Sequence, residues 1–194
     1  LAENGKYDEA YPIWTSLNGY RDSAERAGEI YEPYKEARLR NAAVGEYVLF
    51  GAYEQDNDSS NGAEDIEWLV LAKDSEGLFV VSRYVLDFMQ YTSSTEVVSW
   101  EECSLCKWLN DSFYNSAFRR DEQRRIRNVI GKVLLLSTAE AHKYMDSDEA
   151  RRCAPTAYAI ARGAMTSSTY QADGKDTCGW GLRDGDSTNL HAAT

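Results

Sequence analysis

The chain has 194 residues and a formal net charge of −11, with 21 Lys and Arg against 32 Asp and Glu. This balance argues against a nucleic-acid partner, because contacts to the phosphate backbone need a basic surface. The 43% of hydrophobic and 12% of aromatic residues argue against a disordered chain. No stretch is apolar over the length of a membrane span, so no direct membrane insertion is predicted. Because the chain begins at Leu1 rather than Met, we expect a processed or trimmed fragment.

Residues 1–43 are predicted to form a helical hairpin. Apolar side chains recur at helical spacing over residues 7–17, and the Asn-Gly pair at residues 18–19 marks a turn. A second helix is predicted over residues 23–40, with Pro33 as its weak point. Because one hairpin cannot bury its own apolar face, we expect the end of a longer array or a cap on the next domain.

The stretch from residue 46 to 84 predicts a three-stranded meander. β-Branched and aromatic residues fill the strands, whereas Asn, Asp, Ser and Gly fill the connections. The predicted strands are 47–50, 66–72 and 78–82, joined by a long polar loop at 54–65 and a tight turn at 74–77. The later helices would need such a sheet to pack on. The fold class predicted for residues 44–194 is therefore α+β, with an antiparallel or mixed sheet and short flanking helices.

Capping signals place the short helices of the second half. Ser followed three residues later by Glu is a capping box, and it occurs at 99–102, 137–140 and, with Asp in the first place, 146–149. Pro155 suits the first residue of a helix that ends at Gly163. The predicted helices start after residue 99 and cover 121–127, 138–145, 150–152 and 155–163, with a buried strand at 133–136 and a polar, turn-rich tail from 164.

One loop has the composition of a weak calcium site. Asp56, Asp58 and Ser60 offer the alternating oxygen ligands of a hard cation, with Glu67 eleven residues after Asp56. Asn61 stands where such a loop needs Gly, and the Glu lies in a predicted strand. A polar hairpin loop explains the same residues, so no cofactor is predicted and calcium stays the alternative.

The four cysteines leave several interpretations open. Cys103 and Cys106 have the spacing of half a zinc site or a redox pair, while Cys153 and Cys178 are isolated in sequence and a disulfide between them is open. Buried free thiols explain Cys153 and Cys178 equally well, and they are the preferred interpretation of Cys103 and Cys106, which share a face of the predicted helix. The two histidines, His142 and His191, have no recognisable catalytic context, and no nucleophile, phosphate-binding or dinucleotide motif occurs.

Two resemblances follow from longer motifs. GKYDEAYPIWTSLNGYRDSAERA resembles a tetratricopeptide-like helical hairpin. The ordered runs VLFGAYEQDNDSSNGAEDIEWLVL, WEECSLCKWLNDSFYNSAF, LLLSTAEAHKYMDSDEARRCAPTAYAIARGA and TCGWGLRD resemble a bacterial domain-of-unknown-function family, number 6273, over residues 44–183. That resemblance implies a C-type-lectin-like fold, related to formylglycine-generating enzymes. Because the family continues further, we expect the domain at 44–194 to be incomplete at its C-terminus.

These resemblances lead to one hypothesis and two alternatives. The hypothesis is a non-enzymatic ligand-binding or protein-interaction module of a bacterial surface protein, and hence an extracytoplasmic location. A glycan or protein ligand would stack on exposed aromatic side chains, with Trp180, Arg183 and Tyr170 as predicted contacts. A buried indole and an arginine that bridges loop carbonyls would instead give Trp180 and Arg183 structural roles. The alternatives are a formylglycine-generating type of enzyme that uses a thiol pair, and a purely structural scaffold.

Overall fold

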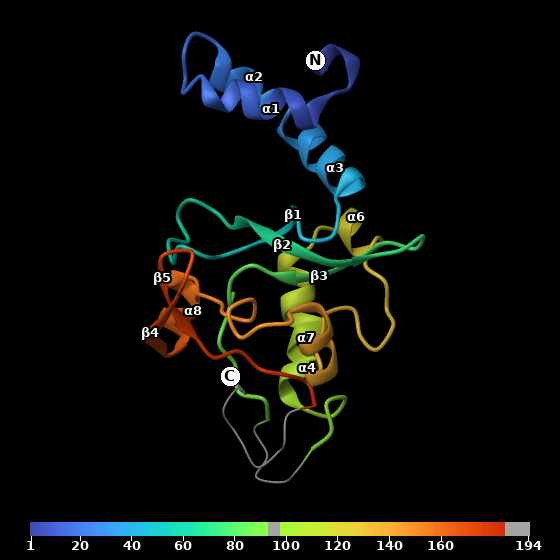
Figure 1. Ribbon diagram of the computed structural model, residues 1–194, viewed down its shortest axis with the longest axis vertical. Coiled ribbons are helices and arrows are strands. Elements are labelled where there is room, and N and C mark those ends of the chain that lie inside the picture. The colour runs from blue at the N-terminus through green and yellow to red at the C-terminus, as the bar shows by residue number, and fades with distance from the viewer. Residues whose placement is uncertain (93–97, 185–194) are drawn as a thin grey trace. The chain divides into compact units, whose positions relative to one another are not determined.

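The computed structural model describes residues 1–92 and 98–184 (Figure 1). Within them the predicted α+β class is confirmed, since short helices combine with two small antiparallel sheets. The helices are α1 (Tyr7–Ser16), α2 (Ser23–Glu29), α3 (Tyr31–Asn41), α4 (Ser104–Trp108), α5 (Tyr114–Ala117), α6 (Arg120–Gln123), α7 (Thr138–Tyr144) and α8 (Ala157–Arg162), with a 3₁₀ turn η1 (Ala2–Asn4) and a π-helical turn η2 (Leu109–Phe113). The strands are β1 (Tyr47–Tyr53), β2 (Glu64–Lys73), β3 (Leu78–Ser82), β4 (Thr166–Ala172) and β5 (Lys175–Cys178).

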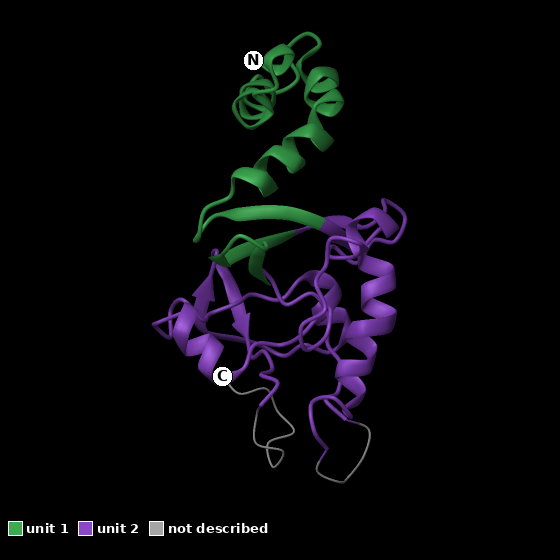
Figure 2. Cartoon of the chain, turned by 90° about the vertical axis from the view of Figure 1, so that its right-hand side faces the viewer, with its two compact units in different colours: residues 1–50, 67–81 green, residues 51–66, 82–194 purple. Residues whose placement is uncertain are grey.

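The chain divides into two compact units (Figure 2). Unit 1 consists of residues 1–50 and 67–81, and unit 2 of residues 51–66 together with the chain from residue 82 onward. The boundaries fall inside the strands of the first sheet. The predicted division of the sequence into 1–43 and 44–194 stays a prediction. None of the helices in the described part of the chain is long and apolar enough to cross a membrane.

Three α-helices, rather than the predicted two, precede the first strand. The helix predicted over residues 23–40 is divided at Ile30 into α2 and α3. Pro33 explains the division, because proline lacks the amide hydrogen that would bond to the carbonyl four residues earlier, and its ring clashes with that carbonyl. The carbonyl in question belongs to Glu29, the last residue of α2. In its actual place Pro33 sits in the first turn of α3, where proline is tolerated.

The first sheet is the meander that the sequence predicts. Its strands are ordered β1-β2-β3, so each strand pairs with its neighbour in the chain. The third strand has the predicted bounds, while the first two are longer than predicted. The turn between β2 and β3 is held by Asp74, whose carboxylate accepts the amide hydrogens of Glu76 and Gly77 at 2.8 and 2.9 Å.

The core of unit 1 lies where α3 meets the unit 1 part of this sheet. Its buried residues are Ala42, Val48 and Val70, covered by the partly buried Leu39, Trp68, Leu78 and Val80. The indole nitrogen of Trp68 donates to the carbonyl of Phe50 at 2.7 Å. Burial of each large apolar side chain stabilises such a core by about 1.5–3 kcal/mol.

The core of unit 2 is built around the continuous helical run α4–η2–α5. The ring of Phe113 lies 4.9 Å from that of Tyr53, 5.6 Å from Trp108 and 6.1 Å from Phe118, measured between centroids. The run begins later than predicted: its N-cap is Cys103, and Ser99 forms only a turn that precedes it. Tryptophan 108 is therefore part of the aromatic core, as its helical spacing predicts.

Two predicted elements are absent from the described residues. Residues 133–136 are extended but pair with no strand, so the predicted strand is wrong. Single groups distant in sequence bind their carbonyls instead: the Asn110 amide donates to Val133 at 2.8 Å, the Arg183 guanidinium to Leu135 at 2.8 Å, and the Arg183 backbone amide to Leu136 at 3.0 Å. The helix predicted at 150–152 is a turn, which fits a segment too short to repay helix nucleation. The capping box at Ser137 and Glu140 is confirmed.

A second sheet appears where the sequence analysis predicts only turns. Strands β4 and β5 form an antiparallel hairpin around Asp173 and Gly174, whose φ angles are 52° and 72°. Positive φ at both central residues is the type I′ turn, which favours the Asp-Gly pair. The predicted helix end at Gly163 is confirmed, while Pro155 lies outside α8 and Thr156 caps it.

Candidate functional site

A groove of about 480 Å³ lies between α1 and α2 in unit 1. Residues of α1 and its C-terminal turn line one side, and residues of α2 with the first residue of α3 line the other. Within each helix the lining positions are three or four apart, so each helix turns one whole face to the groove. We call it the aromatic groove; its lining residues are Tyr11, Trp14, Thr15, Asn18, Gly19, Ala24, Ala27, Gly28 and Tyr31.

Small residues leave the space for this groove. Ala24, Ala27 and Gly28 form the side contributed by α2, where larger side chains would fill the cavity. A Cβ atom added to Gly28 would meet no heavy atom within 4 Å, and the helical backbone of this glycine needs no positive φ. The residue is therefore not required by turn geometry or by close packing against a neighbour.

Aromatic rings form the opposite wall and are held in place by their neighbours. The ring of Tyr11 stacks on that of Tyr34 at 4.3 Å with an interplanar angle of 19°, and lies 5.3 Å from Tyr31. The guanidinium of Arg26 lies 5.4 Å from the Trp14 ring. A wall of pre-ordered rings loses little side-chain entropy when a partner covers it.

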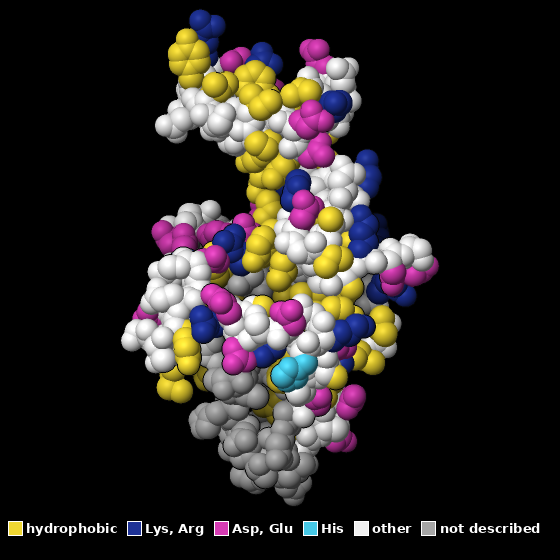
Figure 3. All heavy atoms as spheres, in the orientation of Figure 1, with side chains coloured by type: hydrophobic (Ala, Val, Ile, Leu, Met, Phe, Trp, Pro, Cys, Tyr) yellow, Lys and Arg dark blue, Asp and Glu magenta, His cyan; other side chains and the backbone are white. Residues whose placement is uncertain are grey.

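Apolar side chains beside the groove are also exposed. The side chains of Ile13, Leu17 and Tyr20 are 50%, 41% and 63% exposed. Ile13 directly precedes Trp14 of the groove lining in the sequence of α1. Apolar side chains are visible over α1 and α2 among charged ones (Figure 3). Exposed apolar side chains are thus found on α1 and in the turn that follows it, and groups of exposed apolar side chains are typical of interaction sites.

The residues predicted to bind a ligand near the C-terminus make structural contacts. The indole nitrogen of Trp180 donates to the carbonyl of Arg151 at 2.8 Å. The guanidinium of Arg183 forms a two-point ion pair with Glu140, in which the Nη2–Oε1 distance is 2.8 Å, and also donates to a backbone carbonyl. Asp184 accepts the amide and hydroxyl hydrogens of Thr138 at 2.7 and 3.0 Å.

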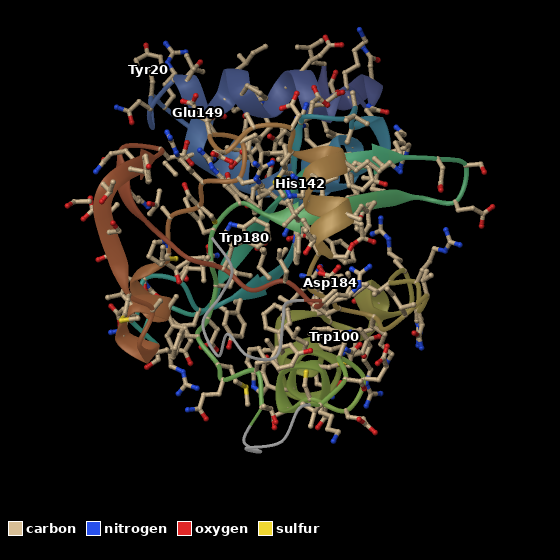
Figure 4. The ribbon with its side chains drawn as sticks, turned by 60° about the horizontal axis from the view of Figure 1, so that its bottom comes forward. Tyr20, Trp100, His142, Glu149, Trp180 and Asp184 are labelled. Atoms are coloured by element: carbon tan, nitrogen blue, oxygen red, sulfur yellow. The ribbon has the colours of Figure 1, made fainter. Side chains whose placement is uncertain are left out.

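These contacts tie the last described segment to the start of α7. Figure 4 shows Trp180 and Asp184 on this segment, with His142 on α7. We call residues 180–184 the C-terminal clasp. Arg183 lowers the pKa of Glu140 by its hydrogen bonds, and Glu140 in turn raises the pKa of Arg183. The indole N–H of Trp180 and the guanidinium of Arg183 are thus both bound within the protein. This is the structural role that the sequence analysis kept open for these two residues.

The third predicted ligand contact, Tyr170, lies on strand β4. Its side chain is 53% exposed, and the guanidinium of Arg152 lies 4.4 Å from its ring centroid. The structure thus places one predicted contact on an exposed strand and two in the clasp. The three side chains contact different groups: Trp180 the carbonyl of Arg151, Arg183 the carboxylate of Glu140, and Tyr170 the guanidinium of Arg152.

The predicted calcium loop is shaped by its own hydrogen bonds. Asp56 and Asp58 each accept the amide hydrogen of the residue two positions later, and Asp58 also accepts the hydroxyl hydrogen of Ser60 at 2.6 Å. Hydrogen bonds from Ser60 lower the pKa of Asp58. A different trio, Glu54, Asp56 and Glu64, brings carboxylate oxygens within 4.8 Å of one another. Calcium binding stays the alternative to the predicted polar hairpin loop.

The thiols lack the environment of a nucleophile. Burial raises the pKa of Cys153 to about 12 and that of Cys178 to about 11, and it also raises the pKa of Cys106. Cys103 is fully buried and accepts the amide hydrogen of Cys106. A reactive thiol needs a lowered pKa and partial exposure. His142 is exposed on α7, and His191 lies outside the described residues.

The aromatic groove was not identified by the sequence analysis. The signal was present as Ala24, Ala27 and Gly28, small residues at positions i, i+3 and i+4, facing an aromatic helix. Such a pattern also occurs where two helices pack closely, and only the positions of α1 and α2 show that the space is open.

Comparison with known proteins gives one family match. No curated protein and no solved structure matches the chain. Of the four motifs that carry the resemblance, only WEECSLCKWLNDSFYNSAF lies wholly within the matched segment. Residues 75–133, from the β2–β3 turn through α6, match the family described as Domain of unknown function (DUF6273), which supports the resemblance to that family over this segment.

Proposed function

We propose that this chain is a non-enzymatic protein-interaction module that binds an apolar helical segment in the aromatic groove of unit 1. The observation that carries the proposal is the exposed apolar surface of α1 beside an open groove. Aromatic rings in concave sites are the side chains that contribute most to protein–protein binding. The proposal belongs to unit 1 alone and needs no contribution from unit 2.

The lining of the groove determines the chemistry of the partner. None of the nine lining residues carries a charge at neutral pH. The hydroxyl of Thr15 donates to the carbonyl oxygen of Tyr11 in the same helix, at 3.1 Å. Asn18 supplies the side-chain amide of the lining, and its other polar side-chain groups are the hydroxyls of Tyr11 and Tyr31 and the indole N–H of Trp14. A groove between two helices, lined by aromatic and small side chains, is a site that an amphipathic helix fills with its apolar face, so we propose a helix as the partner.

Peptide selection tests this proposal. A display library of helical peptides is selected on the full chain, and the affinities of the enriched peptides are then measured for the full chain and for the Gly28→Leu variant. The Cβ of a residue at this position meets no heavy atom within 4 Å, leucine adds bulk to the α2 side of the groove, and its higher helix propensity favours folding of the variant. We expect the enriched peptides to carry apolar residues at positions i, i+3, i+4 and i+7, and to lose at least about tenfold in affinity on Gly28→Leu.

The matched control is Glu25→Leu, which adds the same side chain to α2 at an exposed position outside the groove. The selected peptides should bind this variant and the native chain alike. Equal binding to all three proteins would place the binding surface elsewhere and overturn the proposal.

The wider assignment is part of the same proposal. We propose that α1 and α2 are a tetratricopeptide-like hairpin, that residues 44–194 have a C-type-lectin-like fold, and that the chain belongs to a bacterial surface protein. The support is the resemblance of the sequence motifs. A glycan ligand at Trp180, Arg183 and Tyr170 is the alternative binding mode, and it would require the clasp contacts of the first two to be exchanged for contacts to the sugar.

A further inference from the structure

Cys153 and Cys178 lie on neighbouring backbone segments of unit 2. The amide of Cys178 donates to the carbonyl of Cys153 at 3.0 Å. Segments joined by such a bond hold their Cα atoms roughly 5–6 Å apart, and disulfides bridge Cα atoms about 4.4–6.8 Å apart. Both residues are partly exposed rather than fully buried. Residues far apart in sequence are thus brought to bridging distance.

The two cysteines have unequal support from the rest of the fold. The segment of Cys153 is fixed on its other side, where Val85 donates to Ala154 at 3.0 Å and the thiol of Cys153 donates to the carbonyl of Arg83 at 3.2 Å. Cys178 ends the β4–β5 hairpin, in which most side chains are exposed. A covalent link would therefore fasten the weakly packed hairpin, and the clasp that follows it, to a fixed segment.

We propose that Cys153 and Cys178 form an intramolecular disulfide when the chain meets a low-molecular-weight dialkyl disulfide such as oxidised glutathione. The thiolate of Cys178 attacks one sulfur of the dialkyl disulfide, and the first glutathione thiolate leaves. The thiolate of Cys153 then attacks the sulfur of Cys178, and the second glutathione thiolate leaves. The protein loses two protons and two electrons, and one disulfide is reduced to two thiols.

The environment of the thiols agrees with a bond that is slow to exchange but stable. Burial raises the pKa of both thiols, and the nearby Cys178 contributes to the shift at Cys153. Little thiolate is present at neutral pH, so the reaction is slow, while thiols of high pKa are poor leaving groups and resist reduction of the product. Cys178, whose pKa is raised less, is the first to react.

The other pair is a poorer candidate. Cys103 is fully buried, and its sulfur accepts the amide hydrogen of Cys106 at 3.2 Å as the N-cap of α4. A bond between these two would require that cap to rearrange. The Cys103→Ser and Cys106→Ser double variant keeps a cap at the first position, because Ser is a preferred N-cap residue. It is therefore a matched control that leaves only the proposed pair.

The test uses the full chain, incubated with oxidised glutathione or with a reductant, alkylated with N-ethylmaleimide, and mapped by mass spectrometry. The oxidised chain should weigh about 2 Da less before alkylation, and should lose alkylation at two of its four thiols. The cross-linked peptide should join Cys153 to Cys178. The double variant at 103 and 106 should give the same bond.

Either of two results of the mapping experiment would contradict the proposed disulfide. Full alkylation of both Cys153 and Cys178 after prolonged oxidation of the folded chain would overturn the proposal. So would a cross-link from either of them to Cys103 or Cys106. Mapping of the native sequence avoids dependence on a variant that fails to fold, and the result is independent of any ligand of the aromatic groove.

Discussion

Arg183 and Glu140 show how one ion pair can organise the end of the chain. The side chains are 15% and 28% exposed, and the arginine also binds a backbone carbonyl of the extended segment before α7. Glu140 meanwhile accepts the amide hydrogen of Ser137 at 2.9 Å as part of the capping box. The pair therefore joins a helix start, an extended segment and the C-terminal clasp. Removal of either partner leaves the other partly buried and unpaired.

Arg183→Met should lower the free energy of unfolding by about 2–3 kcal/mol, because Glu140 and the carbonyl of Leu135 lose their donor. Urea denaturation measures this loss. Arg152→Met is the control, since the charge partner of Arg152 is the 85% exposed Glu149 at 4.0 Å, and surface pairs contribute about 0–1 kcal/mol. A stable Arg183→Met protein would show that the clasp is not structural, and would favour a ligand role for this arginine.

The same pair predicts a dependence of stability on pH. The pKa of Glu140 is lowered in the folded protein, chiefly by Arg183. Its contribution is therefore complete above the unfolded-state pKa of about 4.3, and is lost as the pH falls through the folded-state pKa. We expect the difference in unfolding free energy between the native chain and Glu140→Gln to be constant near neutral pH and to shrink below about pH 4. A difference that grows in acid would contradict this.

At the scale of elements, the strength of the local pattern decides what the sequence predicts. The meander was predicted because alternating β-branched and aromatic residues are bounded by polar turns, and the capping box at Ser137 was predicted because its hydrogen bonds are local. Residues 133–136 were predicted wrongly as a strand, since their carbonyl partners come from Asn110 and Arg183, which are distant in sequence. The Asp-Gly turn at residue 173 carried a hairpin signal that was overlooked.

Two glycines allow a matched test of the packing of β1 against the end of α5. Gly51 in β1 has a φ of 71°, and an added Cβ would lie 2.6 Å from the carbonyl oxygen of Ala117. Gly62 has a φ of 91° but would meet nothing within 4 Å. We expect Gly62→Ala to cost about 1–2 kcal/mol from backbone strain alone, and Gly51→Ala to cost at least about 3 kcal/mol. Equal losses of unfolding free energy in the two variants would show that the Ala117 contact is not tight.

The proposed disulfide has its effect at the element scale. Closing the 26-residue loop from Cys153 to Cys178 should stabilise the folded state by about 3 kcal/mol in the chain-entropy model. For a chain of this size we expect the melting temperature to rise by about 5–10 °C on oxidation. Differential scanning calorimetry of oxidised and reduced protein measures the shift. The Cys178→Ser variant should show no such difference, and an equal shift in that variant would assign the effect to the other cysteines.

At the scale of the whole molecule, the sequence predicts that residues 1–43 pack against a partner, but it does not predict which surface the partner covers. One helical hairpin cannot bury its own apolar face, so residues 1–43 were expected to need a partner. The exposure of Ile13, Leu17 and Tyr20 agrees with this expectation. The ligand residues Trp180, Arg183 and Tyr170 were predicted near the C-terminus, because a glycan or protein ligand would stack on exposed aromatic side chains, and this site stays a prediction. The hydrogen-bond partners of Trp180 and Arg183 come from Arg151, Glu140 and Leu135, and no local pattern contains that information.

The most direct test of the central claim is a ¹H–¹⁵N NMR titration of the full chain with a designed amphipathic peptide. The peptide carries leucine at positions i, i+3, i+4 and i+7, and the control peptide carries serine there. We expect saturable shifts of the Gly19 and Gly28 amide signals, because both residues line the groove, and loss of the Gly19 shift in Gly28→Leu but not in Glu25→Leu. Shifts confined to unit 2, or equal shifts with both peptides, would show that the aromatic groove is not the interaction surface.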